Sequence, residues 1–315
     1  MASNDVNQAS SGQERQAFIS EETTVLQPPK GKLASFCDFL YNKNDGTVLG
    51  RTGLSWLEIT VFYIIFYSCL IGFWAMCLAV FMQTLSRDKP TWYGKGSIIG
   101  INPGMGYQPW LRRDPESTLI MFNKSDPSSY KDYVDALAES TKKYENRAGT
   151  RKCTGNETNA DETPLSCEVR MDRATFGDCL AENGFGYKDG KPCVAISLNR
   201  LIGWYPVGYP SVESAPEAVK DYYDTRHIAI ACEGEYYSDQ DNLGKVIYMP
   251  KNGLSFKYYP YKVTENYHQP IVMAKFEKPP PGILVEIECK AYAYNIIHDT
   301  SDRLGMVHFE LLVDQ

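Results

Sequence analysis

Residues 59–86 read ITVFYIIFYSCLIGFWAMCLAVFMQTLS, a run between Glu58 and Arg87 that contains no charged side chain. As an α-helix, a run of this length would extend for roughly 40 Å, because each residue adds about 1.5 Å. The hydrocarbon core of a bilayer is about 30 Å thick, so one tilted helix of this kind can cross it. We therefore expect a single transmembrane helix over residues 56–86.

A signal peptide or a buried globular helix would fit this run less well. A cleaved signal peptide starts within the first residues and has a shorter apolar core, whereas a long polar segment comes first here. A buried helix of a globular protein rarely continues this far without a charge. The pattern predicts a tail over residues 1–55, then the span, then one long hydrophilic domain over residues 87–315.

The charges beside the span do not decide its orientation. Lys43 and Arg51 precede it, and Arg87, Lys89 and Lys95 follow it. The positive-inside rule places the more basic flank in the cytosol, and this count slightly favours the C-terminal flank. Other chemistry has to decide the topology.

Cysteines and glycosylation sequons gather on the C-terminal side of the span. Six of the nine cysteines lie there: Cys153, Cys167, Cys179, Cys193, Cys232 and Cys289. An even set in one hydrophilic block indicates disulfides and an oxidising compartment. Two N-x-S/T sequons, at Asn123 and Asn156, fall in the same block. We therefore expect a cytoplasmic N-terminus and an extracellular C-terminal domain, which is the type II topology.

The pairing of the cysteines is not determined by the sequence, because six cysteines allow fifteen combinations. The simplest hypothesis joins neighbours along the chain, as Cys153–Cys167, Cys179–Cys193 and Cys232–Cys289. Loop-closure arguments assign about 3 kcal/mol to each of the two short loops and about 4 kcal/mol to the long one. Zinc binding fits the cysteines poorly, because the chain has no C-x-x-C pair and only four histidines.

The block after the span is predicted to be a mainly β domain. Residues 283–290 and 307–313 alternate between apolar and polar side chains, as strands with one buried face do. Strand-like runs also occur at 194–198 and 271–276. Residues 130–137 show the i, i+3, i+4, i+7 spacing of a helix. We expect an immunoglobulin-like antiparallel β-sandwich with one packed helix and long loops.

The search for catalytic chemistry finds one weak motif, Asp239-Gln-Asp241. It resembles the D-x-D with which type II glycosyltransferases hold a metal and a nucleotide sugar, but a polar loop is the simpler interpretation. Asp189-Gly190 is interpreted as a hairpin turn. The four histidines are dispersed and lack the spacing of metal ligands: His227, His268, His298 and His308.

We therefore expect no catalytic residues, no metal site and no cofactor. The net charge of the block after the span is about −5, which argues against nucleic acid as a partner.

The apolar run itself indicates a protein partner within the bilayer. Tyr63 and Tyr67 are one helical turn apart, and lipid tails offer tyrosine hydroxyls no hydrogen bonds. Small residues recur at helical spacing and allow close approach of another helix: Ser68, Gly72, Ala75 and Ala79. An ordinary anchor with lipid-facing aromatic side chains is the alternative.

Short motifs along the chain match one known family. Around the span they are Gly50-Arg51-Thr52-Gly53, Phe62-Tyr63, Phe66-Tyr67 and Lys89-Pro90-Thr91. In the later block they include Gly190-Lys191-Pro192-Cys193, Tyr258-Tyr259-Pro260-Tyr261 and Ile287-Glu288-Cys289-Lys290-Ala291. From about residue 35 to the C-terminus, the chain thereby resembles the β subunit of the Na+/K+-transporting ATPase.

The resemblance implies a non-catalytic subunit, resident in the plasma membrane, that pairs with the catalytic α subunit of a P-type cation pump. Such a subunit assists α-subunit folding and delivery and modulates the affinity for extracellular K+. The resemblance also implies three sequential disulfides and a span that packs against two α-subunit helices. The implied α-subunit contacts are Tyr63, Phe66, Tyr67, Gly72, Tyr258, Tyr259 and Tyr261. A small single-span regulatory subunit is a further expected partner, beside the lipid bilayer.

Three alternatives stay open. The H+/K+ pump uses a β subunit of the same pattern, and Lys262 stands where the family often has another tyrosine. A type II glycosyltransferase would act through Asp239-Gln-Asp241. A cell-adhesion glycoprotein would fit the predicted sandwich and the two sequons.

Overall fold

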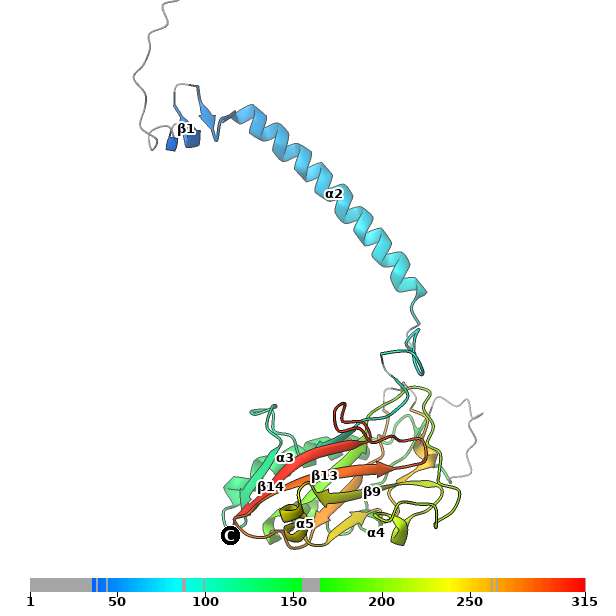
Figure 1. Ribbon diagram of the computed structural model, residues 1–315. Helices are drawn as coiled ribbons and strands as arrows, with labels where there is room; N and C mark the ends of the chain where they lie inside the picture. The colour runs from blue at the N-terminus through cyan, green and yellow to red at the C-terminus, as the bar shows by residue number, and fades with distance from the viewer. Residues whose placement is uncertain are drawn as a thin grey trace, which may run out of the picture. The chain divides into compact units, whose positions relative to one another are not determined.

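The computed structural model describes residues 36–314, apart from residues 38, 44, 87–88, 99, 155–164, 262 and 265. Asn156, one of the two predicted glycosylation sites, lies outside the described residues. The chain divides into two compact units, one ending at Thr84 and the other beginning at Leu85. Figure 1 shows the first as a long helix with a small sheet before it, and the second as a β domain.

The first unit consists mainly of helix α2, Gly53–Thr84, which is the single helix in the described part of the chain that is long and apolar enough to cross a membrane. Three short strands form the sheet before it: β1 Tyr41–Asn42, β2 Thr47–Val48 and β3 Arg51–Thr52. The helix starts directly after Thr52, whose hydroxyl oxygen accepts a hydrogen bond from the Ser55 N–H. None of the residues of α2 is buried within the chain.

The second unit is a two-sheet β-sandwich. The four-stranded sheet has the order β10-β12-β8-β4, with bounds Val246–Met249, Val272–Phe276, Cys193–Leu198 and Met105–Gln108. The five-stranded sheet has the order β11-β9-β13-β14-β5, with bounds Leu254–Ser255, His227–Gly234, Leu284–Tyr292, Met306–Asp314 and Leu119–Asn123. The mainly β fold and the strands predicted from alternation are confirmed.

One edge of the sandwich corrects the antiparallel expectation. Strand β5 pairs with β14 in parallel, with Ile120 opposite Leu311 and Phe122 opposite Val313. Almost the whole domain lies between these two strands in sequence, so no hairpin forces them to run in opposite directions. A parallel pair needs only a long connection, and this chain supplies one.

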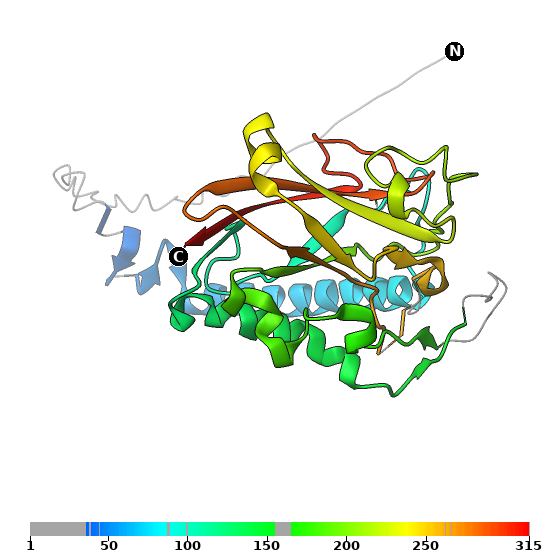
Figure 2. The ribbon, with the colours of Figure 1, turned by 90° about the horizontal axis from the view of Figure 1, so that it is seen from below.

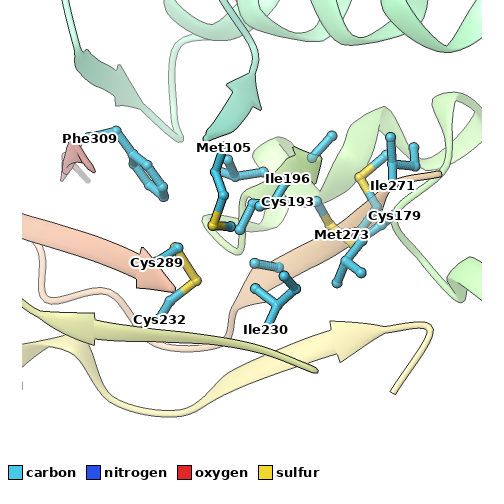
Figure 3. Packing of buried hydrophobic residues seen from close by; sticks show 14 of the residues in the cluster. Met105, Cys179, Cys193, Ile196, Ile230, Cys232, Ile271, Met273, Cys289 and Phe309 are labelled. Atoms are coloured by element: carbon cyan, nitrogen blue, oxygen red, sulfur yellow. A yellow bond between two sulfur atoms is a disulfide. The ribbon is translucent and has the colours of Figure 1, made fainter. Parts of the chain in front are cut away.

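Apolar side chains from both sheets meet between the layers. Figure 3 shows Met105, Ile196 and Met273 of the four-stranded sheet facing the layer that holds Ile230, Cys289 and Phe309. The Phe309 ring stacks on Tyr107 at 4.9 Å between centroids and meets Phe276 edge-on at 6.1 Å. One fully buried ring from the five-stranded sheet therefore contacts two strands of the other sheet.

The predicted helix is α3, Pro127–Lys142, and the spacing of residues 130–137 is confirmed as its inner face. It begins at Asp126, whose carboxylate accepts a hydrogen bond from the Ser128 N–H. The Tyr133 ring stacks on Tyr187 at 6.1 Å, which fixes the helix on the core. A second helix, α5 (Tyr237–Leu243), lies on the opposite side of the domain from α3 (Figure 2).

The remaining short elements occupy the connections. They are β6 Thr150–Arg151, β7 Ser166–Cys167, α4 Arg173–Phe176, and the 3-10 helices η1 Lys143–Glu145, η2 Ala181–Asp189, η3 Lys220–Tyr222 and η4 Phe256–Tyr258. The expected hairpin turn at Asp189-Gly190 is wrong. Gly190 instead caps the end of η2 in the left-handed conformation, with φ of 67°, which glycine adopts without strain.

The structure joins the six cysteines in chain order. The Cα–Cα distances are 5.5 Å for Cys153–Cys167, 5.8 Å for Cys179–Cys193 and 3.9 Å for Cys232–Cys289. Cys232 and Cys289 lie directly opposite each other on β9 and β13. The third disulfide therefore joins neighbouring strands of one sheet, whereas the disulfide of antibody domains bridges two sheets.

Removing the third disulfide should destabilise the domain more than removing the first. Its cysteines are 57 residues apart, against 14 for Cys153 and Cys167, so loop closure predicts losses of about 4 and about 3 kcal/mol. Both cysteines of the third disulfide are also buried. Thermal unfolding of the full chain with Cys232→Ala and Cys289→Ala, compared with the Cys153→Ala and Cys167→Ala pair, measures the difference. Equal unfolding temperatures would contradict the prediction.

An ion pair ties the end of β12 to the segment before β8. The Lys191 Nζ donates to Glu277 Oε2 at 3.1 Å, and the Lys275 Nζ lies 3.2 Å from Glu277 Oε1. The hydrogen bond from Lys191 and the charge of Lys275 lower the pKa of the Glu277 carboxyl below its ordinary value of 4.5. Folding therefore favours the ionised form of this side chain.

The stability that Glu277 supplies should be complete above pH 4.5 and should be lost as the pH falls through its lowered pKa. We expect Glu277→Gln to reduce the unfolding temperature at pH 7 and to flatten its decline in acid. The matched control is Glu217→Gln, whose exposed side chain pairs with Lys220 and should change little. Unfolding curves from pH 7 to pH 3 that run parallel for wild type and Glu277→Gln would refute this assignment.

Candidate partner-binding surfaces

One face of α2 forms a shallow, mainly apolar groove along the helix. It is lined by Trp56, Ile59, Thr60, Tyr63, Ile64, Tyr67, Ser68 and Ile71. The rings of Tyr63 and Tyr67 stack at 5.9 Å between centroids with an interplanar angle of 23°. The two tyrosines thus present one continuous aromatic surface on the outside of the helix.

The hydroxyl groups on this face differ in whether they are satisfied. The Thr60 hydroxyl donates to the Trp56 carbonyl at 2.8 Å, and the Ser68 hydroxyl donates to the Ile64 carbonyl at 2.7 Å. Within the described part of the chain, the hydroxyls of Tyr63 and Tyr67 have no hydrogen-bond partner. In a bilayer core such a group needs a polar partner from another helix, because lipid tails supply none.

The four expected contact residues of the span do not share one face. An α-helix turns by roughly 100° per residue, so Tyr63 and Tyr67 lie about 40° apart around the helix axis. Gly72 lies a further turn of roughly 140° beyond Tyr67 in the same direction. Phe66 lies about 60° from Tyr63 in the opposite direction. Phe66 stacks on Phe62 at 6.1 Å. A Cβ placed on Gly72 would meet no atom within 4 Å, so the helix surface there is open.

The aromatic segment of the outer domain separates into two kinds of residue. Tyr258 ends η4 and is half-buried, with the Lys257 ammonium 5.1 Å from its ring centroid. Burial, and then the charge of Glu168, raise the pKa of Tyr258 to about 12. Tyr259 is buried and meets Trp204 edge-on at 5.6 Å. The structure therefore places Tyr259 in the core of the domain, and its expected contact with another subunit stays a prediction.

Tyr261 belongs to a cation–π cluster that sequence reasoning missed. The rings of Tyr261 and Tyr267 meet edge-on, with 4.7 Å between their centroids. The Cζ atom of Arg200 lies 5.7 Å from the centroid of the Tyr261 ring and 5.4 Å from that of the Tyr267 ring. We call these three residues the Arg200 cluster. Arg200 stands in the Leu198-Asn199-Arg200 motif, but its neighbours come from a segment some sixty residues later, so no local signal pairs them.

Asn123 occupies the end of β5, where a glycan can be attached. Its side-chain oxygen accepts a hydrogen bond from the Ser125 N–H at 2.7 Å, which forms a compact turn across the sequon. Lys124 and Ser125 are exposed. The sequon is therefore presented at the surface of the domain.

The D-x-D motif does not form a nucleotide-sugar site. Asp239 and Asp241 lie in helix α5, so the polar loop expected there is wrong. Asp239 is buried, and its carboxylate accepts a hydrogen bond from the Tyr236 N–H at the start of the helix. A Cβ on Gly234 would approach Asp239 to 2.2 Å, so β9 and α5 pack closely here. The first carboxylate of the motif serves the fold.

Two histidines take part in contacts that the sequence did not suggest. His268 is buried, its Nδ1 accepts from the Val169 N–H, and its Nε2 lies 2.8 Å from the Asn146 carbonyl oxygen. His308 lies beside Glu235 and Glu286, and the three side chains could together hold a metal ion.

Contacts between His308 and carboxylates account equally well for this cluster. The His308 Nδ1 lies 2.5 Å from Glu235 Oε2, and the His308 Nε2 lies 3.4 Å from Glu310 Oε1. The residues of this cluster come from β13, β14 and the end of β9, so only the strand register brings them together.

Taken together, these features define a single-pass membrane protein with a disulfide-bonded β-sandwich and an aromatic helix face suited to a partner. Comparison with known proteins agrees with that class. The family model described as the sodium/potassium ATPase beta chain matches residues 27–309, and the chain belongs to this family.

Relatives from distant animals share most of the chain. A probable sodium/potassium-transporting ATPase subunit beta-3 of Caenorhabditis briggsae is 49% identical over 94% of this chain and 92% of its own length. The subunit beta-2 of Drosophila melanogaster is 35% identical over 91% of this chain and 94% of its own length. The human subunit beta-2 is 28% identical over 88% of this chain and 93% of its own length. The glycosyltransferase and cell-adhesion alternatives find no support in these relatives.

Proposed function

We propose that this chain is the non-catalytic β subunit of a Na+/K+-transporting P-type pump and binds the pump's catalytic α subunit. The observation that carries the proposal is helix α2, none of whose residues is buried within the chain, with its paired Tyr63 and Tyr67, in a chain of the β family. The relatives are named for the sodium/potassium pump, which favours this ion pair over H+ and K+. Assistance to α-subunit folding, delivery to the plasma membrane and tuning of K+ affinity belong to the same proposal.

Two faces of α2 would serve the α subunit. The groove with Tyr63 and Tyr67 offers aromatic area and two free hydroxyls, and the side that carries Gly72 lets a second helix approach closely. The face with Phe62, Phe73 and Val80 lies roughly opposite the middle of these two, so it would meet lipid. Phe66 lies at the boundary between the groove and this lipid face.

The outer domain would add a second area of contact. Tyr258 and Tyr261 are half-buried, so each presents part of a ring, while Tyr259 holds the segment to the core. The Arg200 cluster stiffens Tyr261 and offers a positive charge beside it. A partner surface with acidic or aromatic side chains fits this area. A small single-span regulatory subunit is proposed only as a further component.

A type II orientation belongs to the same proposal. Disulfides persist in oxidising compartments, and all three lie after α2. The surface sequon at Asn123 lies on the same side. Both observations favour an extracellular β domain and a cytoplasmic N-terminal tail.

Replacing Tyr63 and Tyr67 by alanine should reduce recovery of the α subunit several-fold without preventing membrane insertion. The change removes the stacked aromatic surface and both hydroxyls, while the helix stays apolar. The measurement is co-purification of a multi-spanning ATPase from native membranes in mild detergent, quantified by mass spectrometry.

The matched control is Phe73→Ala with Val80→Ala, which removes exposed apolar area from the proposed lipid face. It should leave α-subunit recovery near the wild-type value. Equal recovery for both double variants would mean that the tyrosine face only touches lipid. Recovery of no ATPase with the intact wild-type chain would remove the proposed function itself.

The orientation is tested by the sequon at Asn123. We expect glycosidase treatment to shift the mobility of the wild-type chain, and Asn123→Gln to lose one such shift. We also expect an N-terminal epitope to resist protease added to intact cells and to be cut only after permeabilisation. Cleavage of the epitope on intact cells, with the β domain protected, would reverse the topology.

A further inference from the structure

Six large exposed apolar side chains lie on three segments of the β domain that hydrogen bonds connect to one another. Trp92 is 82% exposed, Ile98 is fully exposed, and four further large side chains, from the same segment and two others, are also exposed. We call this set the apolar rim, and it consists of Trp92, Ile98, Ile101, Val207, Tyr294 and Ile297. Large apolar side chains exposed on linked segments are candidates for an interaction site.

Hydrogen bonds to the backbone hold the three segments of the rim together. The Asn102 side chain donates to the Ile297 carbonyl at 2.8 Å and accepts from the Ile297 N–H at 2.7 Å. The Tyr294 N–H donates to the Val207 carbonyl at 2.7 Å. The rim is therefore a built surface, and its residues cannot separate freely.

The first segment of the rim is also anchored to the rest of the domain. Gly203 has a φ of 72°, and a Cβ at that position would lie 2.9 Å from the Tyr93 ring. The loop after Tyr93 is closed by a bridge between Gly94 and Gly100 and by a hydrogen bond from the Ser97 N–H to the Gly94 carbonyl. Ile98 is carried out into solvent by this closed loop.

We propose that the apolar rim rests in the headgroup region of the lipid leaflet into which α2 emerges. This inference requires α2 to span the membrane and goes beyond the proposed binding of a pump subunit. Trp92 follows Thr84 by eight residues in the sequence, so the Cα of the rim's first residue lies at most about 29 Å from the end of the helix even on a fully extended chain.

The composition of the rim fits the membrane interface. Tryptophan and tyrosine are enriched at the headgroup level, where their rings are apolar and their N–H or O–H groups stay hydrated. Lys89 and Lys95 flank Trp92, and lysine reaches phosphate groups while its methylene chain stays near apolar surface. No acidic residue lies between Lys89 and Trp110, so nothing in this segment repels anionic lipid.

The test measures the depth of a spin label in the complete pump complex reconstituted in lipid nanodiscs. The label is placed at Ile98→Cys in a chain whose free cysteines, Cys37, Cys69 and Cys77, are replaced by alanine. Collision with oxygen, which concentrates in lipid, is compared with collision with a water-soluble nickel chelate. The control label is Tyr237→Cys on α5, where the side chain is 89% exposed.

We expect the ratio of oxygen to nickel accessibility to be several-fold higher at position 98 than at position 237. Equal ratios would place the rim in water and overturn the proposal. Low accessibility to both reagents would also overturn it, because the rim would then be covered by the pump subunit. If the Ile98→Cys chain fails to assemble, Ile297→Cys, which lies in another segment of the rim, carries the same test with the same outcomes.

Discussion

In the described part of the chain, α2 has no second membrane-spanning helix against which to pack, and the proposed function depends on this constraint. Every side chain of α2 is left outward-facing, and the hydroxyls of Tyr63 and Tyr67 find no acceptor in the described chain. Lipid satisfies the apolar side chains but not the hydroxyls. A helix with this surface fits the proposed arrangement, in which lipid covers one side and the partner subunit covers the other.

The β domain is built on a separate basis. Phe309 contacts both sheets, α3 covers the β5 edge through Tyr133, and the disulfides follow the order of the chain. The Cys232–Cys289 bridge joins strands that are already hydrogen-bonded neighbours. Its contribution therefore lies chiefly in restricting the unfolded chain rather than in holding the two sheets together.

The two surfaces proposed for the β domain are linked through neighbouring residues. We propose the Arg200 cluster, with its positive charge and aromatic rings, as a contact for a protein, and the apolar rim, with its tryptophan and isoleucine side chains, as a contact for the membrane interface. The backbone of Tyr261 forms an isolated β-bridge with that of Ile202. The next residue, Gly203, lies close against the Tyr93 ring. The two surfaces thus lie at the same end of the domain, so a chain anchored by α2 could engage protein and lipid together.

The sequence by itself determined the features that depend on local residue patterns. The charge-free run at 59–86 specified α2, alternation specified β13 and β14, and the 3.6-residue period specified α3. Tertiary structure alone decided the parallel β5–β14 pair, the burial of Tyr259, the helix at Asp239 and the meeting of His308 with Glu235. The reason is physical: periodicity reports which face of one element is apolar, whereas these contacts depend on the register between segments far apart in the chain.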